Sequence, residues 1–170
     1  MDNIVIKGHV DTVLVAPDGS RIPVNDGSTT VSYACAELAA QLFAGRGGGP
    51  AKLVMAYSTQ ADEEGGFNFV SGSRTQTRTS IIPADGGLQA AEVALEPNPV
   101  VAPSDSNKYT TGGNAVTFRA MLASNTKVYV YGYLLEDADG RVLAARSLGT
   151  DRIEKPGGYG LSVSWTITFL

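Results

Sequence analysis

The sequence predicts an all-β fold, an antiparallel β-sandwich with one packed α-helix, on three observations. Large apolar side chains alternate with Ser and Thr over residues 161–170, and a period of two is typical of a strand with one covered face. Twenty glycines and eight prolines provide for many turns. Short alternating segments joined by short turns fill the last third of the chain, which favours a sandwich. Trp165, in the middle of the closing strand, is predicted to be buried.

Length and composition limit the protein class. The 170 residues fit one domain spanning 1–170, and 43% hydrophobic residues suffice for a core. Only 18% of the residues are charged, which suits a protein covered by neighbours, and the net charge of −4 argues against nucleic-acid binding. No apolar run is long enough to span a membrane and no signal-peptide pattern is present. We therefore expect a protein made in a cytoplasm, neither exported by a signal peptide nor embedded in a membrane.

The first third of the chain predicts a hairpin, a helix and a strand. Residues 3–25 form the hairpin around a turn at 17–20, and 25–28 are expected to end it. The helix covers residues 31–44, because Val31, Cys35, Leu38 and Leu42 recur at helical spacing and Gly45 is a good stop. Residues 52–58 form the next strand.

The rest of the chain predicts a weakly patterned middle and a regular end. Residues 74–82 are expected to form an exposed strand and 90–95 another, followed by a long loop at 97–113. Residues 114–170 are expected to form an antiparallel meander that contains a tight hairpin turn at 137–140.

Few residues suggest chemistry. His9 is the only histidine and Cys35 the only cysteine, so an intrachain disulfide and a zinc site built from nitrogen and sulfur ligands are excluded by count. Asp137 and Asp139 do not fit a helix–loop–helix calcium loop. The glycine-rich segment 45–50 follows a helix and lacks the lysine of a phosphate loop, and the acids at 62–64 are expected to be solvated. We expect no catalytic residues, no metal and no cofactor.

The segment 127–135 is apolar on both faces. Strict alternation puts Val128, Val130 and Leu134 on one face and Tyr129, Tyr131, Tyr133 and Leu135 on the other. A wet face does not carry three tyrosines and a leucine, so either the helix 31–44 or a neighbouring subunit covers them. The candidate subunit interface consists of five residues: Tyr129, Tyr131, Tyr133, Leu135 and, from the long loop, Tyr109.

Three segments resemble small virion proteins of tailed phages. Residues 131–146 read Tyr-Gly-Tyr-Leu-Leu-Glu-Asp-Ala-Asp-Gly-Arg-Val-Leu-Ala-Ala-Arg, similar to that family's "Glu-x-Gly-Leu-Phe-Asp-x-x-Gly-x-Leu-Leu-Ala-Arg" hairpin. Residues 161–169, Leu-Ser-Val-Ser-Trp-Thr-Ile-Thr-Phe, are similar to its closing "Leu-x-Ile-x-Trp-Thr-Ile-Thr-Phe". The helix followed by the strand at 50–58 also resembles that family, although Tyr57 and the loop 97–113 depart from it.

The resemblance implies a non-enzymatic structural protein of the virion. It would assemble symmetrically with copies of itself and other virion proteins, either in the tail as a fibre or baseplate component or on the head as a decoration protein. The alternative is a carbohydrate-binding module that recognises host glycans, with Tyr129, Tyr131 and Tyr133 as its platform.

Overall fold

The computed structural model describes residues 5–61, 66–70, 76–102 and 113–170. It confirms the all-β class and one substantial helix. The elements in chain order are β1 (Ile6–Val15), β2 (Arg21–Val31), α1 (Tyr33–Phe43), β3 (Pro50–Ser58), α2 (Arg78–Ile81), β4 (Gln89–Ala94), β5 (Val100–Ala102), β6 (Ala115–Ala123), β7 (Val128–Asp137), β8 (Val142–Ser147), a 3₁₀ turn (Gly149–Asp151), β9 (Ile153–Lys155) and β10 (Gly160–Phe169).

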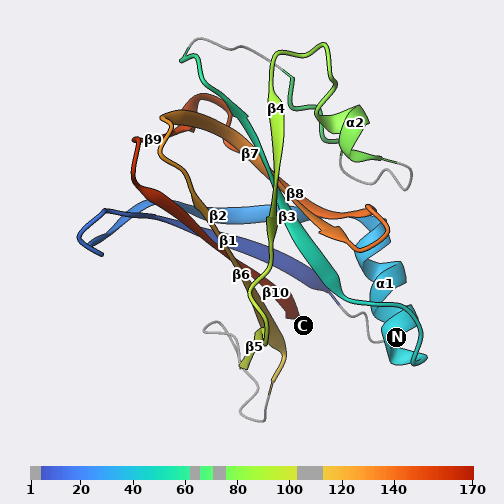
Figure 1. Ribbon diagram of the computed structural model, residues 1–170. Helices are drawn as coiled ribbons and strands as arrows, with labels where there is room; N and C mark the ends of the chain where they lie inside the picture. The colour runs from blue at the N-terminus through green and yellow to red at the C-terminus, as the bar shows by residue number, and fades with distance from the viewer. Residues whose placement is uncertain (1–4, 62–65, 71–75, 103–112) are drawn as a thin grey trace.

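The strands form one curled sheet in place of the two separate sheets of a sandwich (Figure 1). Its order is β4-β3-β7-β8-β2-β1-β10-β6-β5, with β9 beside β7. One half of the sheet consists of β4, β3, β7, β8 and β9, and the other of β2, β1, β10, β6 and β5. The two halves are joined between β8 and β2, where only two residue pairs are formed. At the other side of the curl, the backbone N–H of Glu96, just after β4, donates to the carbonyl of Arg119 on β6 at 2.7 Å. The sheet is therefore a half-barrel whose ends touch.

The predicted C-terminal meander is wrong. Within residues 114–170, β7 and β8 are the only consecutive strands that form a hairpin, while β10 lies between β1 and β6, antiparallel to both. β7 pairs with β3 on its other side. Pairing between strands far apart in the chain depends on which faces must be covered, and local turn signals do not encode it.

The main core fills the inside of the curl. It combines residues from both halves of the sheet and from α1, and Trp165 within it has no exposed surface, as predicted. The alternation of β10 continues inward through Leu161, Val163 and Ile167, which are all buried. The half-barrel is thus filled by side chains, as small barrels are.

Helix α1 confirms the predicted helix, but it begins two residues later, at Tyr33, and ends one residue earlier, at Phe43. β2 continues to Val31, so the expected turn at 25–28 is wrong. Residues 25–28 pair with β1 instead. The guanidinium of Arg146 on β8 adds to this pairing, because it donates to the side chain of Asn25 at 2.8 Å and to the carbonyl of Ser28 at 2.7 Å. On the helix itself Ala34, Cys35 and Leu38 are buried, whereas Leu42 is exposed.

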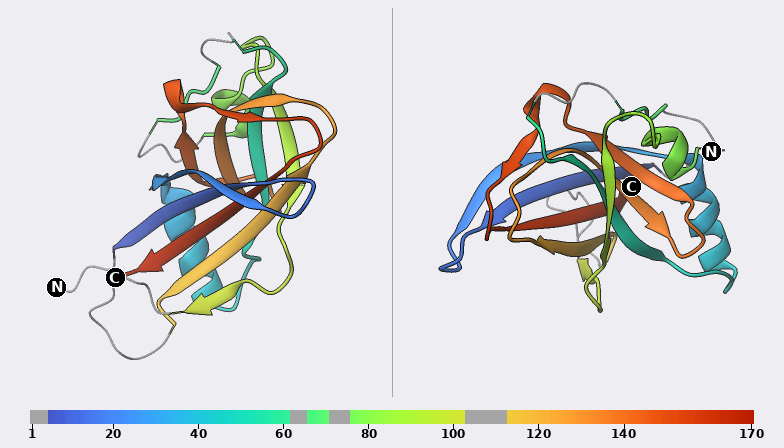
Figure 2. Two further views of the ribbon diagram at one scale, coloured as in Figure 1. Left: turned by 90° about the vertical axis from the view of Figure 1, so that its left-hand side faces the viewer. Right: turned by 45° about the horizontal axis from the view of Figure 1, so that its top comes forward.

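A second apolar cluster lies on the outer face of β3, β7 and β8. It is covered by the described residues 66–70 and 76–88, which we name the strap (Figure 2). Ile81, Ile82 and Leu88 are its buried contacts. The strap carries the short helix α2, capped by Thr77, where an exposed strand was predicted. Gly132 of β7 accommodates the strap, because a Cβ there would lie 2.7 Å from the ring of Phe67.

Among the described residues, neither helix has the length and apolar character needed to cross a membrane.

Candidate functional site

A bulge in β7 changes which residues share a face. Ala56 pairs with Gly132 but the next residue, Tyr57, pairs with Val130, so Tyr131 is an extra residue in the strand. A bulge of one residue inverts the alternation beyond it. The predicted stripe of three tyrosines and a leucine on one face is therefore wrong.

The structure divides the predicted interface between two faces. Tyr133 and Leu135 lie inside the curl with no exposed surface, and Thr12 donates a hydrogen bond to the Tyr133 hydroxyl at 3.3 Å. Tyr131 belongs to the strap side, is 8% exposed, and donates to the carbonyl of Ala61 at 3.1 Å. None of these three offers appreciable surface to a partner, because the chain itself covers them. Burial also raises the pKa of Tyr133.

Tyr129 is the predicted interface residue that keeps appreciable exposure, and Tyr109 lies outside the described residues. The Nζ of Lys127 lies 5.3 Å and the guanidinium carbon of Arg152 5.8 Å from the centre of the Tyr129 ring. Lys127 also pairs with Glu154 at 2.6 Å. Tyr129 is thus already engaged by two cations at the surface.

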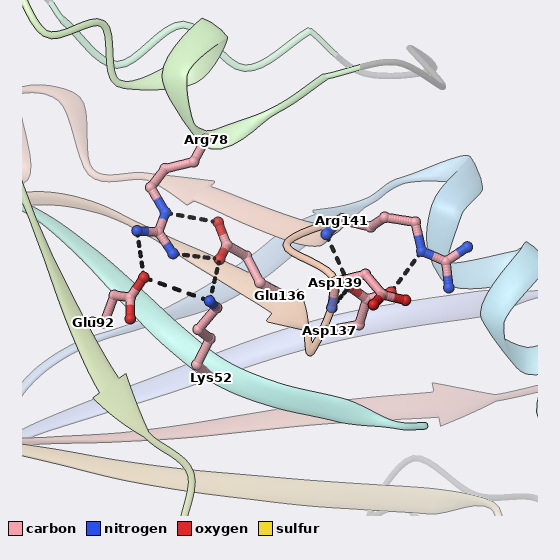
Figure 3. A network of polar contacts seen from close by, with 7 residues as sticks. All are labelled: Lys52, Arg78, Glu92, Glu136, Asp137, Asp139 and Arg141. Atoms are coloured by element: carbon pink, nitrogen blue, oxygen red, sulfur yellow. Dashed lines mark hydrogen bonds and ion pairs between the residues drawn. The ribbon is translucent and has the colours of Figure 1, made fainter. Parts of the chain in front are cut away.

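A network of charged side chains fastens the strap to the sheet (Figure 3). Arg78 of α2 donates two hydrogen bonds to Glu136 of β7, at 3.0 and 2.7 Å. Its third nitrogen lies 2.6 Å from Glu92 of β4, and Lys52 of β3 lies 3.5 Å from Glu92 and 3.9 Å from Glu136. The four residues come from four different elements, so the network joins the strap to three strands.

Because Glu136 is buried, the network stabilises the fold. Glu136 has no exposed surface, and a carboxylate without water needs a bidentate cation to offset its lost hydration. The hydrogen bond to Glu136 raises the pKa of Arg78, and the bond and charge of Arg78 lower the pKa of Glu92. The charged forms of Arg78 and Glu92 therefore stabilise each other.

A buried lysine closes the opposite end of β7. Lys155 of β9 has no exposed surface, and its ammonium donates to the carbonyls of Ser124, Pro156 and Tyr159, each at 2.9 Å. Its three donors meet three acceptors, so the group is satisfied without a carboxylate. Burial lowers the pKa of Lys155. The ammonium thereby ties the β6–β7 turn to the turn before β10.

The structure also shows where Cys35, Asp137 and His9 lie, the other residues considered in the sequence analysis. Cys35 is buried, as expected from its position on the apolar stripe, and burial raises the pKa of its thiol to about 11. Asp137 closes the β7–β8 turn, since its carboxylate accepts from the backbone N–H groups of Asp139 and Arg141 at 3.0 and 2.9 Å. His9 is exposed on β1, beside Asp11.

Exposed apolar side chains gather toward one end of the molecule. The beginning of β1, the end of β10 and β5 meet there through the start of β6, because Ile6 pairs with Phe169, and Ala115 pairs with both Thr168 and Ala102. This end lies low in Figure 1, and α1 runs down toward it. Seven of the ten large hydrophobic side chains that are exposed among the described residues belong to β5, β10, α1 or the residue before β1. We name them the terminal surface: Val5, Tyr33, Leu42, Phe43, Val100, Val101 and Phe169. Phe43 is 97% and Val101 65% exposed. Sequence analysis missed them, because an apolar residue at a strand or helix end looks the same whether or not it is covered.

Comparison with known proteins returned no match to a family model, to a curated protein or to a solved structure.

Proposed function

We propose that this chain is a non-enzymatic structural protein of a tailed-phage particle. It assembles with copies of itself and with other virion proteins, and the terminal surface forms its main contact.

The observation that carries this proposal is the terminal surface itself. Exposed apolar side chains that concentrate at one end of a molecule are a reason to expect association there. Phe43 and Val101, with most of their surface in water, are the largest contributors in exposed fraction. Burying side chains of this kind contributes roughly 25 cal/mol per Å², so covering the patch is a favourable contribution to assembly.

The buried charged groups of the chain support a structural role for the protein. Glu136 fastens the strap, Lys155 joins two turns, and Asp137 shapes a hairpin. Each of these groups uses its hydrogen bonds within the chain. These three groups therefore hold the fold together, which supports a structural role.

The resemblance to small virion proteins supports the choice of particle. The segment that carries it most fully, β10, is paired on both sides and carries Trp165 in the core. The shared pattern therefore corresponds to a central strand, which is a reason for related chains to keep it.

Complementation of a phage that lacks this protein tests the proposal. Particles assembled with Phe43→Ser/Val101→Ser are expected to contain at least tenfold less of the protein than particles assembled with the unaltered chain, by quantitative mass spectrometry. The matched control is Val70→Ser, which also removes an exposed apolar side chain, 62% exposed, but from the strap. The control is expected to be incorporated normally.

The position on the particle follows from the same experiment. Electron microscopy of complemented particles distinguishes a head lattice from a ring or fibre on the tail. Absence of the unaltered chain from purified particles would overturn the proposal. Equal incorporation of the double variant and the control would place the contact elsewhere than on the terminal surface.

The glycan-binding alternative receives no support from the tyrosines. Tyr131 and Tyr133 are buried within the chain, so they do not form a platform with Tyr129. We therefore propose no second function.

A further inference from the structure

Three side chains able to bind a metal ion meet on the outer face of β1 and β2. Asp11 and Asp26 are directly opposite each other in the antiparallel register, and His9 lies two residues from Asp11, so all three share one face of the sheet. One ligand atom of each lies within 4.8 Å of the other two. All three residues are exposed and reachable from solvent.

The donor set and the spacing fit a transition-metal ion. The Nε2 atom of His9 lies 3.5 Å from Oδ1 of Asp11. Zinc binds imidazole nitrogen and carboxylate oxygen at about 2.0–2.2 Å, which in tetrahedral geometry puts neighbouring ligand atoms about 3.4 Å apart. The first two ligands already have this spacing. The ligand oxygen of Asp26 lies within 4.8 Å of the other two ligand atoms, and its exposed side chain would have to rotate to come as close as they are to each other.

Within the part of the chain that the structure describes, neither aspartate has a lysine or arginine as an ion-pair partner. Like charges directly opposite on neighbouring strands are destabilising. Among the described residues, the ion pair of Asp11 with His9 is the one that either carboxylate makes. Arg146, which contacts this part of β2, donates to the backbone carbonyl of Asp26 at 3.1 Å and not to its carboxylate. A divalent cation between the strands would remove this repulsion.

The strands hold the three residues in place. A register shift between Thr12 and Val13 sets the pairing that brings Asp26 opposite Asp11. Arg146 then fixes β2 at this point through Asn25 and the carbonyl of Ser28. The ligands therefore stand on paired backbone, which makes their spacing a property of the sheet.

We propose that His9, Asp11 and Asp26 bind one divalent transition-metal ion such as Zn²⁺. One imidazole and two carboxylates favour such an ion over Ca²⁺ or Mg²⁺, which prefer oxygen ligands alone. Three protein ligands leave a further coordination position for water. The site is independent of the terminal surface, since it lies on a different part of the fold.

Zinc titration of the full chain without a histidine tag tests the proposal. Because His9 is the only histidine, its imidazole gives a single set of NMR signals. We expect these signals to shift with one equivalent of Zn²⁺, and calorimetry to give one site. Asp26→Asn is expected to weaken Zn²⁺ binding at least tenfold, and so is Asp11→Asn. Asp85→Asn, an exposed carboxylate on the strap, is the matched control and is expected to bind as the unaltered chain does.

The variants distinguish a built site from a lone imidazole. If Asp26→Asn and Asp11→Asn, with backbone spectra otherwise unchanged, bind Zn²⁺ within twofold of the unaltered chain, then His9 binds alone and the proposal is wrong. It is also wrong if the His9 signals do not respond to Zn²⁺, or if Ca²⁺ shifts them equally. Using two separate carboxylate variants keeps the test valid if one of them folds poorly.

Discussion

Strands β7 and β10 have the same length but opposite burial patterns. β10 alternates, with apolar side chains in the core and half-buried Ser164, Thr166 and Thr168 on the outside. β7 is buried along nearly its whole length. The difference arises because the strap covers the outer face of β7, whereas Ser164, Thr166 and Thr168 on the outer face of β10 stay half-exposed. A continuous apolar run thus indicates a strand with two covered faces.

The two outer faces also differ in how they treat polar groups. On β10, the hydroxyls of Thr166 and Thr117 lie 2.8 Å apart and remain partly open to water. On β7, Glu136 is fully buried and depends on Arg78. A polar group on a covered face needs a dedicated partner, while one on an open face can use water.

Replacement of Trp165 by alanine is expected to have the largest effect. The side chain is fully buried at the centre of the core, and truncation of such a residue lowers the free energy of unfolding by about 3–5 kcal/mol. Urea denaturation measures this. The control is Thr168→Ala on the open face of the same strand, with an expected change within about 0.5 kcal/mol. Equal effects would show that β10 does not have one covered and one open face.

Leu134→Thr tests whether the strap makes a second core. This change gives β7 the outer-face chemistry of β10, and we expect a loss of about 3 kcal/mol, because a buried leucine is shortened and a hydroxyl is buried in its place. Urea denaturation again gives the value. A loss below about 1 kcal/mol would contradict a close-packed strap.

Arg78→Ala is expected to cost somewhat less, about 2 kcal/mol. Breaking a fully buried ion pair costs about 3–5 kcal/mol, but Arg78 is about a quarter exposed and Lys52 remains near Glu136. The double variant Arg78→Ala/Glu136→Gln is expected to be more stable than Arg78→Ala alone, since no charge is left buried. Additive losses would mean that the two residues are not coupled.

The smallest expected effect concerns Cys35, whose accessibility is measured by chemical labelling of the thiol. Because burial raises the pKa of the thiol to about 11, reaction with a disulfide reagent at pH 8 is expected to be slow in the folded protein and fast in urea above the midpoint. Its folded pKa also lies above the ordinary thiol value, so this group's contribution to stability is lost as pH rises through about 9 to 11. Rapid labelling of the folded chain would show that α1 opens readily.

Features that depend on residues close together in the sequence were predictable, and features that depend on strand pairing were not. The period of β10 and the place of Trp165 in the core were both predictable, as was the helix from its spacing. The true faces of the tyrosines in β7 were not predictable. One bulge at Tyr131 inverts the alternation, and the residue types give no sign of that bulge. Asp26 was missed as a partner of Asp11 because residues 25–28 have the composition of a turn, whereas pairing with β1 and the hydrogen bonds of Arg146 keep them extended.

The sequence alone determined the all-β class, the main helix and the inward face of the closing strand, since these depend on periods and turn residues within a few positions of each other. Tertiary structure decided the single curled sheet, the strap, the buried pairing of Arg78 with Glu136 and the meeting of His9, Asp11 and Asp26. These features join segments far apart in the chain. Their energy comes from covering faces and neutralising buried charge, which is fixed only once the strands have chosen their neighbours.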